Sequence, residues 1–150
     1  MAVFTPVDLP QAQVLADRLQ LGQVSELKGI EGGIENTNYF VTTTHGRYVL
    51  TLFEKLKAHE LPFYIDLMTH LARHGIPCPQ PIADRANTVI GALNGKPASI
   101  FTCVPGADLS AVDTAHCATI GELLAEDGVA DAEPGRDHPR ERRQIGRAHV

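Results

Sequence analysis

The sequence predicts an α+β fold in which a five-stranded, mostly antiparallel sheet carries one crossing helix. Short runs of strand-forming residues separated by turn signals indicate the strands. Two longer stretches repeat their apolar residues at helical spacing, and Asn94-Gly95 between two strand-like runs is a strong hairpin signal. The length of 150 residues and the hydrophobic content of 43% fit one globular domain.

The first expected element is a helix over residues 8–20. Asp8 can cap this helix, Pro10 fits its first turn, and Gly22 would end it. Its apolar stripe is expected to consist of Val14, Leu15 and Leu19.

The next three elements are expected to be strands because they are rich in strand-forming residues. They cover residues 24–30, 38–43 and 47–53. His45-Gly46 would form a tight turn between the last two strands. The third strand is largely apolar at both alternating sets of positions, so both of its faces are expected to be covered.

A second, amphipathic helix is expected over residues 58–74, with Gly75 at its end. Its apolar positions recur at helical spacing and include Leu61, Ile65, Met68 and Leu71. Residues 88–93 and 96–104 then form two strands joined at Asn94-Gly95. This order suits the small lobe of a kinase-like fold, although other α+β domains share it.

The composition changes after a third helix, which is expected over residues 113–125 with Asp113 as its cap. Residues 126–150 hold 11 of the 31 charged residues of the chain and almost no large apolar side chains. Glu126-Asp127-Gly128 is expected to break the helix, so we predict that residues 126–150 are a disordered or aberrant tail. Residues 145–150, IGRAHV, match the translation of a sequencing adapter, and a frameshift near residue 126 is our hypothesis for the tail.

Composition argues against several classes of function. The net charge of −5 and the lack of a Lys/Arg stripe predict no nucleic-acid partner. No apolar run approaches the roughly 20 residues of a membrane helix, and no secretory signal is visible at the N-terminus. The three cysteines form no CxxC pair, so neither a disulfide framework nor a zinc site is expected. These features predict a cytoplasmic protein without a membrane partner.

A glycine-containing loop is the first candidate site. Its paired glycines let backbone N–H groups approach an anion, and the polar residues behind them offer donors and acceptors. The residues concerned are Gly32, Gly33, Ile34, Glu35, Asn36, Thr37 and Asn38. Such a loop can cover nucleotide phosphates, but an ordinary hairpin loop has the same spacing. It is not a P-loop, because no Gly-Lys-Ser/Thr follows it.

A resemblance makes the interpretation specific. The segments that carry it are GIENTNYFVTT, RYVLTLFEK, ELPFY, LARHGIPCPQPIADR and LNGKPA. Together they resemble the small lobe of bacterial homoserine kinases of the aminoglycoside-phosphotransferase-like (protein-kinase-like) superfamily, over about residues 1–125. The resemblance implies a kinase that uses ATP to phosphorylate the side-chain hydroxyl of L-homoserine, a step of threonine biosynthesis. It also implies that Gly32–Asn38 covers the nucleotide.

The resemblance implies two further contacts with the nucleotide. In kinases of this fold, a Lys on the third strand pairs with the phosphates and with an acidic residue on the next helix. That position falls near Thr51, which is uncharged; Lys55 lies just beyond the strand and Asp66 on the helix, and both also suit solvated surface positions. The adenine edge is expected to meet the carbonyl of Thr102 and the N–H of Val104 at the hinge between lobes.

The resemblance divides the chain into a small lobe with its hinge, the start of a second helical lobe, and the tail, over residues 1–107, 108–125 and 126–150. No His-x-Asp-x-x-x-x-Asn segment follows residue 107, so no catalytic residue or Mg²⁺ ligand is predicted in this chain. We therefore expect an inactive fragment of a homoserine kinase, with Mg²⁺ needed by the full-length enzyme. The alternatives are a related kinase for an aminoglycoside, choline or methylthioribose, or a non-catalytic nucleotide-binding lobe. The sequence leaves the oligomeric state open.

Overall fold

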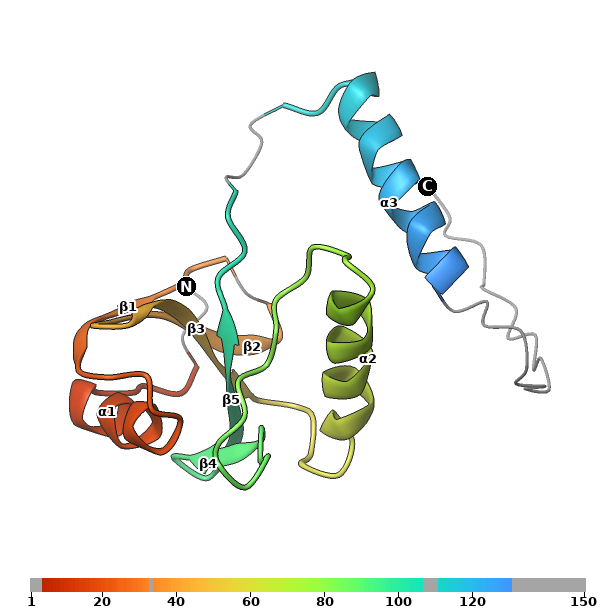
Figure 1. Cartoon of the computed structure of the whole chain (residues 1–150). Helices are drawn as coiled ribbons and strands as arrows, with labels where there is room; N and C mark the ends of the chain where they lie inside the picture. The colour runs from red at the N-terminus through yellow and green to blue at the C-terminus, as the bar shows by residue number, and fades with distance from the viewer. Residues whose placement is uncertain (1–3, 33, 107–110, 131–150) are drawn as a thin grey trace.

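The computed structural model describes residues 4–32, 34–106 and 111–130 of the chain. Its elements follow the expected order of helix, three strands, helix, two strands and helix (Figure 1). The elements are α1 (Leu9–Arg18), β1 (Val24–Gly29), β2 (Asn36–Thr43), β3 (Gly46–Phe53), α2 (Leu61–Arg73), β4 (Gly91–Leu93), β5 (Lys96–Thr102) and α3 (Thr114–Ala130).

The five strands form one sheet in the order β1-β2-β3-β5-β4, and all neighbouring strands are antiparallel. The predicted α+β class with a five-stranded antiparallel sheet is therefore confirmed. The longest ladder joins β2 to β3 over the full 8 residues of each strand. β2 begins at Asn36, earlier than the expected range 38–43, because Asn36 pairs with Phe53 at the end of β3.

The hairpin of β4 and β5 turns at Asn94-Gly95, as the sequence predicts. Asn94 has a φ of 51° and Gly95 a φ of 76°, the left-handed conformation that a two-residue type I′ turn requires. Asn94 also anchors this turn to the N-terminal segment, since its Nδ2 donates a hydrogen bond of 2.7 Å to the carbonyl of Pro6.

Both strands of this hairpin are shorter than the expected ranges 88–93 and 96–104. The chain before β4 is held in a turn by Asp84, whose carboxylate accepts hydrogen bonds from two following backbone N–H groups. β5 ends at Thr102, the last of its residues with a partner on β3. The turn at Asp84 therefore sets where β4 can begin, and the end of the pairing with β3 sets where β5 ends. Strand propensity sets neither boundary.

Helix α1 begins with a capping box. The carboxylate of Asp8 accepts a hydrogen bond of 2.8 Å from the N–H of Gln11, whose side chain accepts one of 3.0 Å from the N–H of Asp8. The helix buries Ala12, Leu15 and Ala16. Val14, expected in the apolar stripe, is 71% exposed, because neighbouring helix positions point about 100° apart.

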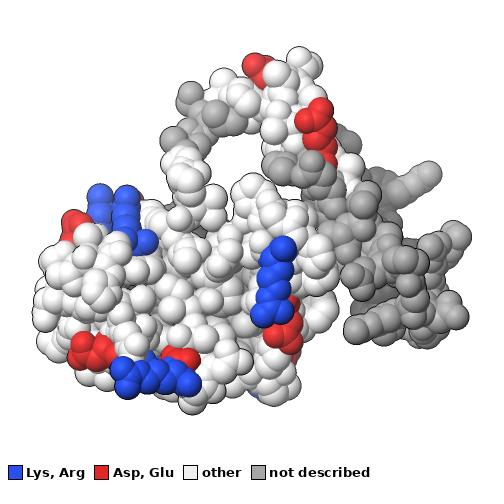
Figure 2. Space-filling model, viewed as in Figure 1, with Lys and Arg blue, Asp and Glu red and all other residues white. Residues whose placement is uncertain are grey.

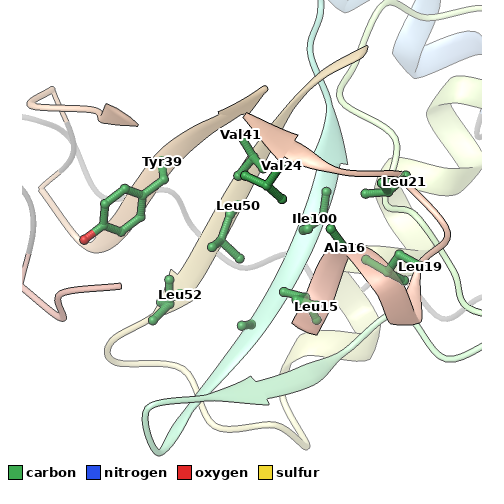
Figure 3. Close-up of a cluster of buried hydrophobic side chains, with 11 residues drawn as sticks. Leu15, Ala16, Leu19, Leu21, Val24, Tyr39, Val41, Leu50, Leu52 and Ile100 are labelled. Atoms are coloured by element: carbon green, nitrogen blue, oxygen red, sulfur yellow. The ribbon is translucent and has the colours of Figure 1, made fainter. Parts of the chain in front are cut away.

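The main core lies between α1 and one face of the sheet (Figure 3). Its largest fully buried side chains are Val41, Leu50, Leu52 and Ile100. Burial of each large aliphatic side chain of this kind contributes about 1.5–3 kcal/mol. At the edge of this core, the hydroxyl of Tyr39 accepts a hydrogen bond of 3.0 Å from the N–H of Val7 and ties the N-terminal segment to β2.

A smaller apolar cluster lies on the opposite face of the sheet, under α2. It consists of Phe53, Leu61, Ile65 and Phe101. Figure 1 shows α1 and α2 on the two sides of the sheet. The cluster covers only the part of this sheet face that β3 and β5 form. Next to the cluster, side chains of β2 and β3 border an open groove.

The segment between α2 and β4 runs beside the second half of β5. The N–H of Ile82 donates a hydrogen bond of 2.9 Å to the carbonyl of Ile100, and the N–H of Thr102 donates one of 2.9 Å to the carbonyl of Gln80. β4 pairs with the first half of β5. β5 is therefore hydrogen-bonded along both of its edges.

Helix α3 begins as predicted but extends further than predicted. The carboxylate of Asp113 accepts a hydrogen bond of 2.9 Å from the N–H of His116, which confirms Asp113 as the cap. The helix continues to Ala130, so Glu126-Asp127-Gly128 does not break it; one glycine in a helix costs only about 1 kcal/mol. Residues 107–110 and 131–150 lie outside the described residues, so the domain boundaries and the tail remain predictions.

The surface carries no large field of one sign on the face seen in Figure 2, where basic and acidic side chains lie next to one another in small groups. In the described part of the chain, no helix is both long and apolar enough to cross a bilayer. Among the described residues, Cys78, Cys103 and Cys117 take part in no disulfide.

Candidate functional site

The open face of the sheet contains a groove of about 250 Å³. β2, β3 and β5 line it, with one residue from α2 and one from the segment that follows α2. The lining residues are Asn36, Asn38, Val49, Thr51, Phe53, Met68, Pro79 and Phe101. The groove is mainly apolar with a few polar groups, a common character of sites for small organic ligands.

Alternation along the strands explains this selection. In β3, Leu50 and Leu52 point into the core, so Val49, Thr51 and Phe53 point toward the groove. β2 follows the same rule: Asn36 and Asn38 border the groove, whereas Thr37 and Tyr39 are buried on the other side. A shift of register by one residue would exchange the two sets of side chains.

Thr51 and Asn38 form the polar centre of the groove. They are direct cross-strand partners, and the Thr51 hydroxyl donates a hydrogen bond of 2.8 Å to Oδ1 of Asn38. Thr51 is only 8% exposed, so this hydrogen bond satisfies a nearly buried hydroxyl. At the position where the family resemblance places a lysine, the chain therefore has the uncharged pair of Thr51 and Asn38, and Thr51 forms no ion pair with α2.

Thr37 points away from the groove, although it lies within the predicted loop. Its side chain is fully buried on the other face of the sheet. Its oxygen accepts hydrogen bonds from the N–H groups of Phe4 (2.9 Å) and Thr5 (3.1 Å) and donates one of 2.7 Å to Glu54. The side chain of Thr37 therefore anchors the N-terminal segment.

Glu54 is the charged member of this anchor. Burial alone would raise the pKa of Glu54, but hydrogen bonds from Thr5, Thr37 and Lys96, together with the charge of Lys96, outweigh burial and lower the pKa below its usual value. The Lys96 ammonium lies 3.3 Å from the Glu54 carboxylate. The result is a stable ion pair on the core side of the sheet.

The glycine-containing loop projects from the end of the groove. Ile34 is 88% exposed, and a Cβ added at Gly32 would meet nothing within 4 Å, so this part of the loop is open to solvent. Glu35 forms an ion pair with Lys55, with 3.2 Å between the charged atoms. Gly33 lies outside the described residues.

Helix α2 contributes Met68 to the groove rather than a carboxylate. Asp66 borders a separate surface depression with Phe63, Leu67 and His70. Among the described residues, no group of three or more His, Cys, Asp and Glu side chains could hold a metal ion.

The predicted hinge residues follow directly on the groove. Phe101 lines it and is 6% exposed, Thr102 ends β5, and Val104 is 42% exposed. The Thr102 hydroxyl accepts a hydrogen bond of 2.9 Å from the N–H of Gln80. The structure therefore brings the hinge to one end of the groove and the glycine-containing loop to the other.

Sequence reasoning missed five of the lining residues. They are Val49, Phe53, Met68, Pro79 and Phe101. Strand alternation from Thr51 would have found Val49 and Phe53. Met68 and Pro79 reach the groove only through the packing of α2 and the chain after it, for which the sequence offers no local signal.

Comparisons with known proteins agree with this fold. A model of the phosphotransferase enzyme family matches residues 26–147. An amicoumacin kinase in complex with AMP-PNP and Ca²⁺ superposes with a TM-score of 0.53 at 18% identity, over 65% of this chain and 32% of that chain. A spectinomycin phosphotransferase in complex with ADP superposes with a TM-score of 0.57 at 14% identity, over 76% of this chain and 36% of that chain.

The sequence relatives are more similar. The homoserine kinase of Methylobacillus flagellatus is 52% identical over 88% of this chain, and that of Burkholderia thailandensis is 50% identical over 93% of it. In both cases the match covers 41% of the relative, so the chain spans less than half the length of these proteins. The resemblance to homoserine kinases is confirmed, and the chain belongs to the phosphotransferase enzyme family.

Proposed function

We propose that this chain is the nucleotide-binding small lobe of a homoserine kinase, which transfers a phosphoryl group from ATP to the side-chain hydroxyl of L-homoserine for threonine biosynthesis. One observation carries the proposal: the chain is about half identical to homoserine kinases over nearly its whole length. The groove supports it, since an apolar site open at a strand end suits a purine.

In this proposal the adenine ring lies in the groove near Val49 and Phe101. Its polar edge meets the carbonyl of Thr102 and the N–H of Val104, the main-chain groups that follow Phe101. The phosphates extend toward Gly32–Asn38, where Asn36 and Asn38 offer amide groups. The side chain of Thr37 takes no part, because it is buried on the opposite face.

The remaining requirements of phosphoryl transfer lie outside this lobe in our proposal. A base that orients the acceptor hydroxyl and ligands for Mg²⁺ are needed. The sequence has no His-x-Asp-x-x-x-x-Asn segment after residue 107, and the chain spans 41% of the length of its Methylobacillus flagellatus relative. We therefore assign Mg²⁺, L-homoserine and the catalytic base to the part of the full-length enzyme that the chain does not span. The described cysteines form no disulfide, which suits a reducing cytoplasm, and we propose the cytoplasm as the location of the enzyme.

A chimera tests this function. Residues 1–125 of this chain would replace the matching segment of the Methylobacillus flagellatus homoserine kinase, and ADP release would be measured with L-homoserine. We expect homoserine-dependent turnover, with none from the 150-residue chain alone. A folded chimera that binds no ATP would contradict the proposal, as would turnover by the chain alone.

Two alternative functions can be distinguished from the proposed one by experiment. A kinase for another small molecule would have the same groove, since the antibiotic kinases share this fold. Assays of a full-length protein carrying this lobe with choline, an aminoglycoside and methylthioribose in place of homoserine would identify it. The uncharged groove favours a second candidate, a lobe that binds nucleotide without catalysis, and ATP binding without turnover in the chimera would support it.

A further inference from the structure

The groove lacks the positive charge that a nucleotide triphosphate calls for. None of the eight described residues that line it is charged, and by the family pattern the strand position that holds a lysine in kinases of this fold falls near Thr51. The Thr51 hydroxyl is already used in a hydrogen bond to Asn38. If the groove binds ATP, a cation must reach the phosphates from outside the lining residues.

Lys55 and Lys96 both lie near the end of the sheet from which the glycine-containing loop projects, and Lys96 is already held in an ion pair with Glu54. The Lys96 ammonium contacts both the carboxylate of Glu54 (3.3 Å) and the Glu54 backbone carbonyl (3.4 Å). The side chain of Glu54 is 13% exposed and bonds to Thr37 on the core face. Releasing Lys96 would leave a largely buried carboxylate without its positively charged partner, which is costly.

Lys55 is held far more loosely. Its only partner among the described residues is Glu35, and the side chains of the two residues are 69% and 66% exposed. An exposed ion pair of this kind contributes about 0–1 kcal/mol, so exchange of one anion for another is inexpensive.

The position of this pair matches the expected path of the phosphates. Asn36 and Phe53 are the last cross-strand partners of β2 and β3, and both line the groove. Glu35 precedes Asn36 directly, and Lys55 follows Phe53 by two residues. The Glu35–Lys55 ion pair therefore lies just beyond the last paired residues of β2 and β3, where the glycine-containing loop leaves the sheet.

We propose that Lys55 is the phosphate-binding cation of this lobe, taking the role that Thr51 cannot fill, and that Glu35 holds it in place until nucleotide enters. This inference rests on the proposed nucleotide-binding function. As the phosphates arrive, Lys55 exchanges the Glu35 carboxylate for phosphate oxygens. The same exchange releases Glu35, and with it the tie between the loop and the end of β3.

Equilibrium binding to the full 150-residue chain tests the inference, with metal-free ATP and adenosine as probes. We expect Lys55→Gln to weaken ATP binding about three- to tenfold and to leave adenosine binding unchanged, which is the loss expected for one solvent-exposed contact. Lys55→Arg should retain most of the ATP affinity. Lys57→Gln is the matched control, since Lys57 is an exposed lysine two residues further along the chain.

Substitution of Glu35 provides a second test of the inference. Glu35→Gln should strengthen ATP binding about twofold, and this gain should shrink when Lys55→Gln is also present, because the carboxylate then has no lysine to hold. Equal ATP affinity in the wild type and Lys55→Gln would overturn the inference while leaving the proposed function intact. A folded wild-type chain that binds neither ATP nor adenosine would overturn both.

Discussion

Thr51 and Asn38 face each other across β3 and β2 and are joined by a hydrogen bond of 2.8 Å in the floor of the groove. A charged side chain at position 51 would need a counter-ion there, and α2 presents Met68 to the groove instead of a carboxylate. The neutral pair is thus consistent with its surroundings.

Substitution of Thr51 tests the structural value of this pair. Thr51→Val should lower the free energy of unfolding by about 1–2 kcal/mol, because Oδ1 of Asn38 loses its donor in a largely buried place. Thr51→Ser should retain most of the stability. Urea denaturation of the three proteins measures the difference, and equal midpoints for Thr51→Val and the wild type would contradict the role of the hydrogen bond.

The core should depend most strongly on Leu50. Leu50 is fully buried at the centre of the sheet, so Leu50→Ala should cost about 2–5 kcal/mol. A lobe of this size has little stability to spare, so we expect loss of cooperative unfolding as followed by circular dichroism. Val14→Ala is the control; it should change the stability little, because Val14 is 71% exposed.

Stability should fall in acid partly through Glu54. Its folded-state pKa is lowered below the ordinary value of 4.5, so the ionised form stabilises the fold above that value. The contribution is lost as the pH falls through the lowered pKa. The difference in unfolding free energy between the wild type and Glu54→Gln should therefore be largest near neutral pH and shrink as the pH falls below the ordinary value of 4.5 and through the lowered pKa. An unchanged difference across this range would exclude Glu54 as a source of the acid sensitivity.

The isolated chain should be prone to association through α2. Phe63, Tyr64 and Leu67 are 69%, 46% and 39% exposed on one helix, an unusual concentration of large apolar side chains. The double substitution Phe63→Gln and Leu67→Gln should reduce light scattering at a given protein concentration, whereas Val14→Gln on α1 should not. A wild-type chain that stays monomeric and unfolds reversibly would contradict this prediction.

The sequence predicted the fold where local signals were strong. The Asn94-Gly95 turn and the Asp8 and Asp113 caps appear where their chemistry placed them. The strand prediction failed where a side chain competes with strand propensity, because the Asp84 turn shortens β4. The helix prediction failed because one glycine costs a helix too little to end it, so α3 continues past Gly128.

The candidate site shows the same division. The loop was predicted from its glycines and polar residues, and Thr51 and the hinge from the family resemblance. Thr37 points to the other face because β2 extends back to Asn36, so that Thr37 alternates with Asn36 and Asn38 inside a strand rather than lying in the loop. The contributions of Met68 and Pro79 depend on tertiary packing of segments distant in sequence. Such contacts cannot be inferred from one sequence by spacing alone.

The proline-bearing segment beside β5 has a consequence for how this lobe meets other chains. With β4 along one half of β5 and residues 80–82 along the other, β5 itself offers no free row of backbone donors to an incoming strand. Pro77, Pro79 and Pro81 have no N–H to contribute, which blunts the outer rim further. Misassembly by strand addition is thus discouraged here, and engineering of a soluble free-standing lobe can concentrate on the groove and the outer surface of α2.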